Sequence, residues 1–484
     1  MIPVVAGIAN KKQEGTGMKP VWTAFALLAI SPSFAAEPLR TDQAKFRELY
    51  KELVETDTSI TTGDCTLLAG KIEGHLKAAG FTSEQITRFA VPEHPKEGGI
   101  VAVLPGSSTT LKPILLLGHL DVVTAKREDW TRDPYQFIEE GGYFYGRGTA
   151  DMKMLDAIWI DMLMRFKIEG TKLKRTLKLA LTCGEESSMA FNGAKWLTEN
   201  RRALIDAEFA LNEGGGGQSD GNGKLVTATL HVGEKVYVNY RIEATNPGGH
   251  SSAPIRDNAI YELADALAKV RDLEFPLQMT DTTREYFKRT GKARGDAMGE
   301  AMIALANNPS DAKAEATVNT DKQYHTLLRT TCVATLLDGG HAENALPQRA
   351  GALVNCRIFP SVDAETVRAT LEKAIGDPRM TVKLINDRGP LAVPPPLNAK
   401  IVRPAEKLVA KYHPGVPLIP TMSAFATDGV FLEAAGIPSY GPPGVWTDPD
   451  GNGMHGLNER QSVEAVYSGR DLLTELVQAY ANQQ

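Results

Sequence analysis

The sequence has few cysteines, no long apolar run in its interior and no excess of basic residues. Its four cysteines, Cys65, Cys183, Cys332 and Cys356, include no CxxC pair, which argues against a cysteine-bound metal. No internal segment approaches the roughly 18 apolar residues of a membrane helix. A formal charge of −6 and a pI near 5.9 give no indication of nucleic-acid binding. Internal repeats and low-complexity tracts are also missing from the sequence.

Two states of the cysteines are compatible with the sequence. Cys332 and Cys356 lie in strand-like segments joined by one connection, so they can pair in an exported protein. The alternative, which we favour at this stage, is that the cysteines are buried thiols. The distance between the two Cα atoms distinguishes these states.

The N-terminal 35 residues have the pattern of a secretory signal peptide with an upstream extension. Met18-Lys19 precedes a short apolar run, and Ser33-Phe-Ala35 is a small-x-small cleavage site. A short anchor helix is the alternative, but the run is too short to span a membrane. Met1 and Met18 are both candidate start residues. We therefore expect an exported protein, periplasmic or secreted, whose mature chain begins at Ala36.

The length of 484 residues predicts two domains, because it exceeds what one core usually supports. Residues 36–233 alternate strands and helices, which predicts a layered αβα domain with a mainly parallel sheet. Residues 234–387 follow a βαββαβ order, typical of a compact α+β domain. Within them, residues 275–329 form a polar, helix-compatible insertion, with a helix expected over 294–307. Residues 388–484 return to the first domain, so the α+β domain is itself inserted.

Acidic and imidazole side chains follow the predicted strands of the first domain. His119 and Asp121 lie in Gly118-His-Leu-Asp, Glu185 and Glu186 follow Leu177–Cys183, and Glu213 follows Ala207–Asn212. In open α/β sheets, active sites form at this carboxyl edge of the strands. Asp151 in Gly146-Arg-Gly-Thr-Ala-Asp and His455 near the C-terminus complete the set. Two imidazoles and several carboxylates suit a pair of borderline metals such as zinc.

These residues divide into two predicted metal sites. A hydrolytic two-metal site needs a carboxylate shared by both metals and a base for the attacking water. We expect Asp151 to be shared, His119 and Glu213 to bind one metal, and Glu186 and His455 to bind the other. Adjacent side chains on a strand point in opposite directions, so only one of the two neighbouring glutamates ligates. Asp121 lies on the face of His119 and is expected to accept its second imidazole N–H.

These motifs resemble the co-catalytic zinc exopeptidase and deacylase family that includes glutamate carboxypeptidase, acetylornithine deacetylase, succinyl-diaminopimelate desuccinylase, aminoacylase and carnosinase. The resemblance rests on Gly118-His-Leu-Asp121, Gly146–Lys153, Gly184-Glu-Glu186 and Gly248-Gly-His-Ser-Ser252, and it extends from about Phe46 to the C-terminal helix. It implies two Zn²⁺ per subunit, with Co²⁺ or Mn²⁺ as substitutes, and Glu185 as the general base. Within the family, the sequence is most similar to the Gly-X carboxypeptidase and N-acyl-amino-acid hydrolase branch.

The resemblance also assigns roles to the inserted domain, which serves as a lid and dimerisation domain in this family. His250 would polarise the scissile carbonyl, often in the partner subunit's site. Asn344 and Arg357 would bind the substrate carboxylate, and Arg is suited to this because it binds carboxylates with two parallel hydrogen bonds. The resemblance therefore predicts a homodimer formed through this domain.

The sequence predicts a metallocarboxypeptidase or dipeptidase that cleaves the amide next to a free C-terminal carboxylate. The close alternative is a deacylase of N-acyl amino acids, which shares the chemistry. A non-catalytic metal-dependent binding protein is disfavoured because it would not need Glu185. An aminopeptidase would recognise a free amine, for which the lid domain offers no dedicated acid.

Overall fold

The computed structural model describes residues 39–187, 191–387 and 393–483. The predicted signal peptide, residues 1–35, lies outside the described residues. In the part of the chain that is described, no helix is long and apolar enough to cross a membrane.

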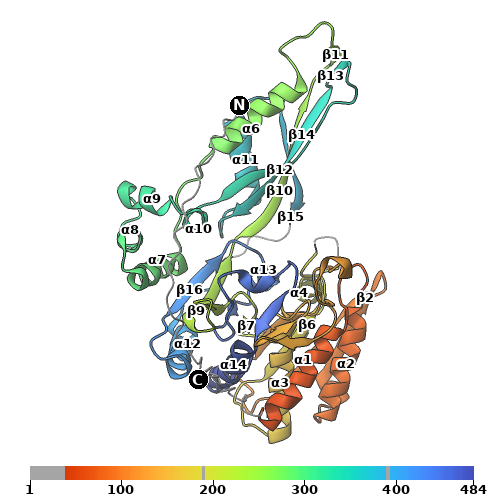
Figure 1. The fold of residues 1–484 in the computed structure, drawn as a ribbon, viewed down its shortest axis with the longest axis vertical. Helices are drawn as coiled ribbons and strands as arrows, with labels where there is room; N and C mark the ends of the chain where they lie inside the picture. The colour runs from red at the N-terminus through yellow and green to blue at the C-terminus, as the bar shows by residue number, and fades with distance from the viewer. Residues whose placement is uncertain (1–38, 188–190, 388–392, 484) are drawn as a thin grey trace, which may run out of the picture. The chain divides into compact units, whose positions relative to one another are not determined.

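A nine-stranded sheet forms the centre of the first domain (Figure 1). Its main path runs in the order β1 (Ile86–Val91), β2 (His94–Leu104), β6 (Leu177–Thr182), β3 (Ile114–His119), β7 (Phe209–Leu211), β17 (Ser439–Gly441), β9 (Leu225–Glu234) and β16 (Leu418–Ser423), and β8 (Gly216–Ser219) pairs with β9. The central strands β6, β3, β7 and β17 pair in parallel, in agreement with the predicted mainly parallel sheet. Strands β9, β16 and β17 were not themselves predicted.

Helices cover both faces of this sheet, because β3 is apolar on both sides. Ile114 and Leu116 belong to one hydrophobic core, whereas Leu115 and Leu117 belong to another. The first core is closed by α1 (Thr41–Glu55), α2 (Cys65–Ala78), α3 (Lys153–Glu169), α12 (Ala399–Tyr412) and α14 (Val463–Asn482). The second is closed by α4 (Gly193–Asn200), α5 (Arg202–Ile205) and α13 (Gly429–Ala434). The αβα layering predicted from the sequence is confirmed.

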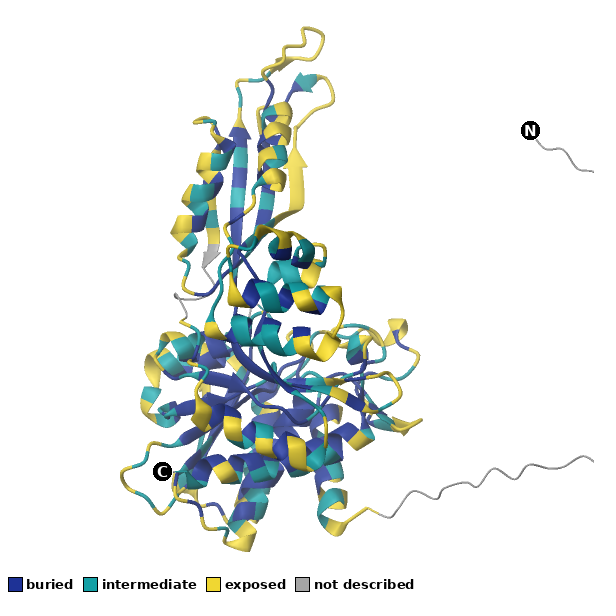
Figure 2. Ribbon diagram, turned by 90° about the vertical axis from the view of Figure 1, so that its left-hand side faces the viewer, coloured by how far each residue is buried: buried dark blue, intermediate teal, exposed yellow. Residues whose placement is uncertain are grey.

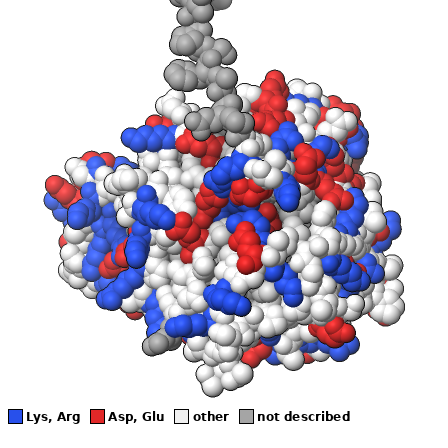
Figure 3. Space-filling view, turned by 90° about the horizontal axis from the view of Figure 1, so that it is seen from below, with Lys and Arg blue, Asp and Glu red and all other residues white. Residues whose placement is uncertain are grey.

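Short elements complete this domain. Strands β4 (Ile138–Glu140), β5 (Tyr143–Tyr145) and β18 (Arg460–Ser462) form a three-stranded sheet, and the 3-10 turns are η1 (Ser83–Gln85), η2 (Arg127–Asp129) and η3 (Gly451–Gly453). On the face drawn in Figure 3, basic and acidic side chains are interspersed with uncharged surface. This face therefore does not offer the continuous basic surface that nucleic-acid binding requires.

The second sheet has the order β12 (Thr331–Gly339), β14 (Arg349–Ile358), β10 (Val236–Thr245) and β15 (Thr381–Asp387), all antiparallel. Helices α6 (Ala259–Asp272) and α11 (Ala364–Ile375) supply the rest of its hydrophobic core. The βαββαβ order is the predicted one. A small two-stranded antiparallel sheet, β11 (Gly249–His250) with β13 (Ala345–Leu346), lies in its connections. We refer to residues 234–387 as the lid domain.

The insertion in the lid domain is helical and has a small core of its own. It contains α7 (Asp281–Arg294), α8 (Ala297–Asn307), α9 (Ala312–Val318) and α10 (Lys322–Thr326). The helix predicted over 294–307 begins later, because Gly295 takes a left-handed conformation that caps α7, and Asp296 then caps α8. Arg289 of α7 donates hydrogen bonds to the Glu406 carboxylate and the Leu418 carbonyl oxygen.

All four cysteines are in disulfides, so the expectation of buried thiols is wrong. Cys332 and Cys356 bond because β12 and β14 are antiparallel neighbours that place them directly opposite one another. Cys65 bonds to Cys183 across 118 residues. This second pair was not predicted, because its proximity depends on the packing of α2 beside the end of β6.

Candidate metal centre

Three loops that carry predicted site residues meet at one edge of the large sheet. Strand β3 has β6 and β7 as parallel neighbours. His119 ends β3, Glu185 and Glu186 follow β6, and Glu213 follows β7. Because parallel strands end at the same edge, these side chains are brought together, as the sequence predicted.

Asp151 and His455 join this cluster from outside the strands. Asp151 precedes α3, and His455 lies between η3 and β18. His119 Nε2 is 3.4 Å from Asp151 Oδ1 and 3.8 Å from a Glu213 carboxylate oxygen. His455 Nε2 is 3.0 Å from Asp151 Oδ2 and 3.1 Å from a Glu186 oxygen. Asp151 thus presents one oxygen to each imidazole.

These contacts define two candidate cation sites with the predicted composition. One comprises His119, Asp151 and Glu213, and the other comprises Asp151, Glu186 and His455; within each, the ligand atoms lie within 4.8 Å of one another. The buried His119 Nε2 has no hydrogen-bond partner among the described residues. A buried nitrogen without a partner, facing carboxylate oxygens, fits a metal ligand.

The charges of this cluster are strongly perturbed. Burial alone would raise the pKa of Asp151, but the two imidazoles beside its carboxylate hold it well below its ordinary value. Hydrogen bonds to Asp151 and Glu186 raise the pKa of His455 to about 10. Burial raises the pKa of Glu213. Such crowding of carboxylates is what a bound cation relieves.

Glu185 lies beside the two sites but belongs to neither ligand group. It lines a cavity of about 560 Å³ together with Asp151, Glu186, Glu213 and His455. Burial is the main cause that raises the pKa of Glu185 well above its ordinary value, and the negative charge of the nearby Glu213 carboxylate raises it further. A carboxylate in this position can reach a molecule in the cavity without being occupied as a ligand.

The Gly184 backbone sets the direction of the two glutamates. Its φ is +93°, and a Cβ at this position would lie 1.9 Å from the Phe191 carbonyl oxygen. Only glycine fits without displacing the backbone. The turn that presents Glu185 and Glu186 therefore depends on this residue.

Asp121 has a different contact from the one predicted. His119 Nδ1 lies 3.0 Å from the carbonyl oxygen of Asp121 and 3.8 Å from its carboxylate. The carboxylate instead accepts hydrogen bonds from the backbone N–H groups of Glu185 and Glu186, at 3.3 and 3.0 Å. The expected carboxylate–imidazole hydrogen bond is therefore corrected: the backbone orients His119, and the side chain orients the two glutamates.

Three residues that support the site were not assigned roles from the sequence. Glu459 accepts hydrogen bonds from the backbone N–H groups of Ala150 and Asp151 and binds Arg147 at 2.6 Å. Asp428 accepts hydrogen bonds from Thr182 and Asn192. The sequence did contain an indication of two of these roles. Glu459 lies four residues after His455, and Arg147 lies inside the Gly146–Asp151 motif. Asp428 offered no comparable signal.

The predicted lid residues lie at two opposite ends of the lid domain. His250 is in β11, and the Ser251 N–H donates to the Asn344 carbonyl oxygen at 3.1 Å, so His250 and Asn344 both belong to the small β11–β13 sheet. Arg357 pairs with Tyr237 at the start of β10, whereas β11 follows the end of that strand, so the structure does not bring Arg357 next to the other two. Arg357 lies on β14, with its guanidinium 4.7 Å from the ring centre of Tyr237. The residues that line the 560 Å³ cavity come from segments 150–229 and 425–461, so these three do not belong to its wall.

An αβα layered sheet with two adjoining imidazole–carboxylate sites at its carboxyl edge defines a metal-dependent hydrolase. Comparison with known proteins gives the family. Residues 115–479 match peptidase family M20/M25/M40, so the chain belongs to this family. It is a hydrolase, and its two candidate cation sites agree with membership of a metallopeptidase family.

Similar proteins include both acyl-amino-acid hydrolases and peptidases. The chain is 27% identical over 411 residues to human N-fatty-acyl-amino acid synthase/hydrolase PM20D1, covering 82% of this chain and 80% of the relative. It is 26% identical over 407 residues to rat aminoacylase-1B, covering 80% and 84%. The fold is similar to the M20 family metallo-carboxypeptidase Sso-CP2 from Sulfolobus solfataricus, with a TM-score of 0.67, 18% identity, and coverage of 92% of this chain and 100% of that chain.

Proposed function

We propose that this protein is a two-zinc exopeptidase that hydrolyses an amide bond next to a free C-terminal carboxylate. The observation that carries the proposal is Asp151, whose two oxygens face the two imidazoles. His119, Glu213 and Asp151 would hold one metal, and Glu186, His455 and Asp151 the other. Mixed nitrogen and oxygen ligands favour zinc, and Co²⁺ or Mn²⁺ can substitute.

In the proposed mechanism, Glu185 accepts a proton from the attacking water and passes it to the leaving amine. Two bound divalent metals would supply an acidified water and polarise the substrate carbonyl. Asp121 keeps the Glu185–Glu186 turn in place through its two backbone hydrogen bonds. Glu459 does the same for Asp151 through the amides of Ala150 and Asp151.

The lid domain would supply substrate recognition. His250 Nδ1 accepts a hydrogen bond from the Ser252 N–H at 3.1 Å, so the neutral ring carries its proton on Nε2. That N–H is suited to donate to a carbonyl oxygen, which is the role we propose for His250. Arg357 would bind the substrate carboxylate. Asn344 lies with His250 at the other end of the lid domain, so we propose that these two residues reach a substrate held in the second subunit of a homodimer. Closure of the lid domain would exclude water.

A substrate panel tests this proposal. The zinc-loaded protein from Ala36 onward is assayed with dipeptides, N-acyl amino acids and their C-terminal amides. We expect release of free amino acid from the free acids and at least about 100-fold slower turnover of the amides, because the amides lack the charged group that Arg357 binds. Equal turnover of acids and amides would remove the carboxylate-binding role, and turnover that survives removal of the metal would contradict the whole mechanism.

A second candidate, N-acyl-amino-acid hydrolysis, is favoured by the wall of the cavity. Beside the acidic cluster, the wall includes Thr229, Thr447 and Gln461 together with six apolar side chains: Met152, Met154, Leu155, Phe425, Val445 and Met454. Such a wall suits an apolar acyl group, because burial of each CH₂ contributes about 0.8 kcal/mol. The relatives named as acyl-amino-acid hydrolases agree with this candidate. Within the panel, a kcat/KM that rises with acyl chain length would select it over the peptidase.

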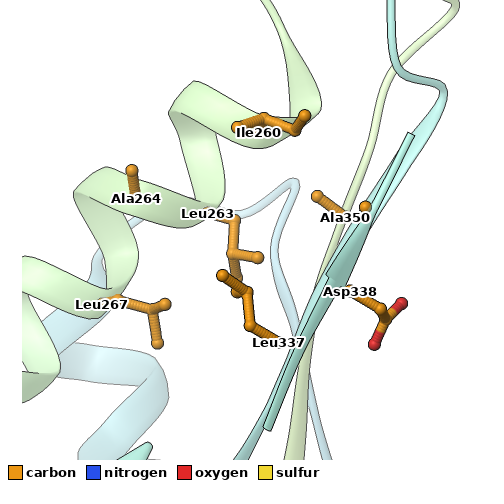
Figure 4. Close-up of a pocket in the computed structure, with 8 residues that line it drawn as sticks. Ile260, Leu263, Ala264, Leu267, Leu337, Asp338 and Ala350 are labelled. Atoms are coloured by element: carbon orange, nitrogen blue, oxygen red, sulfur yellow. The ribbon is translucent and has the colours of Figure 1, made fainter. Parts of the chain in front are cut away.

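We further propose that the protein is a homodimer formed through the edge of the lid-domain sheet. Strand β12 is the outer strand, and it is exposed along most of its length (Figure 2). Leu336 and Leu337 are 64% and 70% exposed. Leu337 also contributes to an apolar groove of about 290 Å³, where Leu263 and Leu267 of α6 face it (Figure 4). An exposed edge strand with apolar side chains is suited to pair with a second copy.

Replacement of Leu336 by lysine tests this interface. A charge on the edge strand opposes pairing, so we expect the variant to be monomeric at concentrations where the unaltered protein is dimeric. Sedimentation velocity measures the mass in solution, and Val226→Lys, an exposed apolar residue on β9 of the other sheet, is the matched control. An unaltered protein that is monomeric at all concentrations would contradict the proposal.

We also propose that the protein is exported to the periplasm or secreted. The leader pattern of residues 1–35 supports this, and so do the two disulfides, since disulfides persist in oxidising compartments. N-terminal sequencing of the protein recovered outside the cytoplasm checks the proposal, with Ala36 as the expected first residue.

A further inference from the structure

The Cys65–Cys183 disulfide lies next to the residues that carry the proposed chemistry. Cys183 directly follows β6 and is separated from Glu185 only by Gly184, while Cys65 is the first residue of α2. Both cysteines are 2% exposed. The two sulfur atoms and an Asp121 carboxylate oxygen lie within 4.8 Å of one another. The disulfide thus packs against the side chain that orients Glu185 and Glu186.

Two links therefore hold the start of the Glu185–Glu186 turn. One is the pair of hydrogen bonds from the backbone N–H groups of these glutamates to Asp121. The other is the covalent bond from Cys183 to α2. The hydrogen bonds fix the turn relative to the loop after β3, and the disulfide fixes it relative to a separate segment.

That segment, residues 56–65, also contacts the two neighbouring site loops. Thr58 Oγ1 donates to the Leu120 carbonyl oxygen at 2.6 Å, beside His119. Ser59 forms a parallel bridge with Val122. Lys153, two residues after Asp151, is fully buried and donates to the Thr56 carbonyl oxygen at 2.7 Å. Residues 56–65 thus join the loops of His119, Asp151 and Glu185, and we call this segment the brace.

We propose that the Cys65–Cys183 disulfide is a positioning element for the general base, which holds Glu185 at the distance that proton transfer requires by tying its turn to the brace. The proposal rests on the proposed function of Glu185. Its physical basis is that catalysis tolerates little displacement: an error of about 1 Å in the position of a reacting group can lower the rate about 100-fold. The hydrogen bonds to Asp121 alone would hold the turn only through the loop after β3, which itself contacts the brace through the non-covalent contacts of Thr58 and Ser59.

The chain contains a matched control for this disulfide. Cys332–Cys356 joins neighbouring strands of the lid domain and has no contact with the brace. The double variants Cys65→Ala/Cys183→Ala and Cys332→Ala/Cys356→Ala are compared as full mature chains loaded with zinc. Metal content and Tm are measured for each, and kcat and KM are measured at least 15 degrees below the lower Tm.

We expect the first double variant to lose about 10- to 100-fold in kcat with KM changed less than about 2-fold and metal content unchanged. The control variant should keep its kcat even if its Tm falls. An unchanged kcat in the first variant, or an equal loss in both, would overturn the proposal. A loss of metal would also overturn it, because the disulfide would then support the ligands and not the base.

A double-mutant cycle separates positioning of Glu185 from a general structural effect. In a Glu185→Gln background, the loss of Cys65–Cys183 should lower the residual rate by less than about 2-fold, because the group being positioned is already gone. Additive losses would contradict the proposal. If Glu185→Gln alone leaves kcat intact, the proposed base is wrong, and this outcome is distinguishable from a failure of the disulfide proposal.

Should the first variant fail to fold, the unaltered enzyme provides a second measurement. A water-soluble phosphine reduces each disulfide to two thiols and is itself oxidised to the phosphine oxide with oxygen from water. Alkylation and peptide mass spectrometry then give the fraction of each disulfide that is reduced. We expect kcat to fall in proportion to reduction of Cys65–Cys183 and to be independent of Cys332–Cys356; the opposite dependence would overturn the proposal.

Discussion

Replacement of Glu185 by glutamine is expected to lower kcat by about 100- to 10,000-fold, the range over which a positioned general base contributes. Glutamine is nearly isosteric but cannot accept the proton from the attacking water. Since Glu185 is outside both ligand groups, two metals per chain should remain bound. Turnover of a free-acid substrate and metal content by atomic emission, measured on the same preparation, check both parts of this expectation.

Glu433→Gln is a suitable control for that experiment. Glu433 is also withdrawn from water, and burial raises its pKa to about 8, but it lies on α13 and does not line the cavity. The control should keep its kcat within about 3-fold. If Glu185→Gln retained normal turnover, another group would have to accept the proton. If it lost a metal, Glu185 would be a ligand and the division of roles between Glu185 and Glu186 would be incorrect.

The second large effect is expected at Arg357. Replacement by methionine keeps much of the side-chain length but removes the charge and the paired N–H donors. Loss of a hydrogen-bonded charge partner costs about 2–5 kcal/mol, so kcat/KM for free-acid substrates should fall by at least about 30-fold. The slow turnover of the corresponding amides should barely change, because an amide has no carboxylate for Arg357 to bind. The ratio of acid to amide kcat/KM is therefore the quantity to measure.

Arg241→Met serves as the comparison for Arg357. Arg241 lies in β10 of the same sheet and binds the Asp338 carboxylate with two hydrogen bonds. Its loss removes an arginine from the lid domain without removing the proposed substrate contact, so the acid-to-amide ratio should stay constant. A similar fall of the ratio in both variants would mean that the net charge of the lid domain, and not Arg357 itself, favours the acids.

The residues that meet in the two candidate cation sites could be predicted because most of them occupy positions that the local sequence pattern specifies. His119, Glu186 and Glu213 all follow apolar strands that pair in parallel, and such strands end at one edge. Asp151 was marked by the glycines before it. His455 was harder, since its loop has no regular secondary structure, but it carried the second imidazole that the site needed. The order of strands and helices in the lid domain could also be predicted from local pattern, because strands such as β10 and β14 alternate buried and less buried positions.

What could not be predicted depends on contacts between distant segments. Cys65 and Cys183 are 118 residues apart, and they meet because α2 packs against β2, the neighbour of β6 in the sheet. The Asp121 carboxylate accepts hydrogen bonds from the backbone N–H groups of Glu185 and Glu186, which are 64 and 65 residues later in the sequence. Whether this carboxylate faces these N–H groups or the His119 ring depends on the conformation of the two loops, which the sequence pattern does not specify. Strands β9 and β16 pair although Leu230 and Thr421 are 191 residues apart in the sequence, so the local sequence of neither strand indicated its partner.

The order of the site residues along the chain has a consequence for biosynthesis. His455 contacts Asp151 across 304 residues, and Glu459 contacts Arg147 across 312, with the entire lid domain between them. In the proposed two-metal site, a nascent chain that has produced His119, Asp151 and Glu213 holds the ligands of only one candidate site. The other site additionally needs His455, so the proposed hydrolysis requires a chain synthesised at least as far as this residue and folded back onto Asp151.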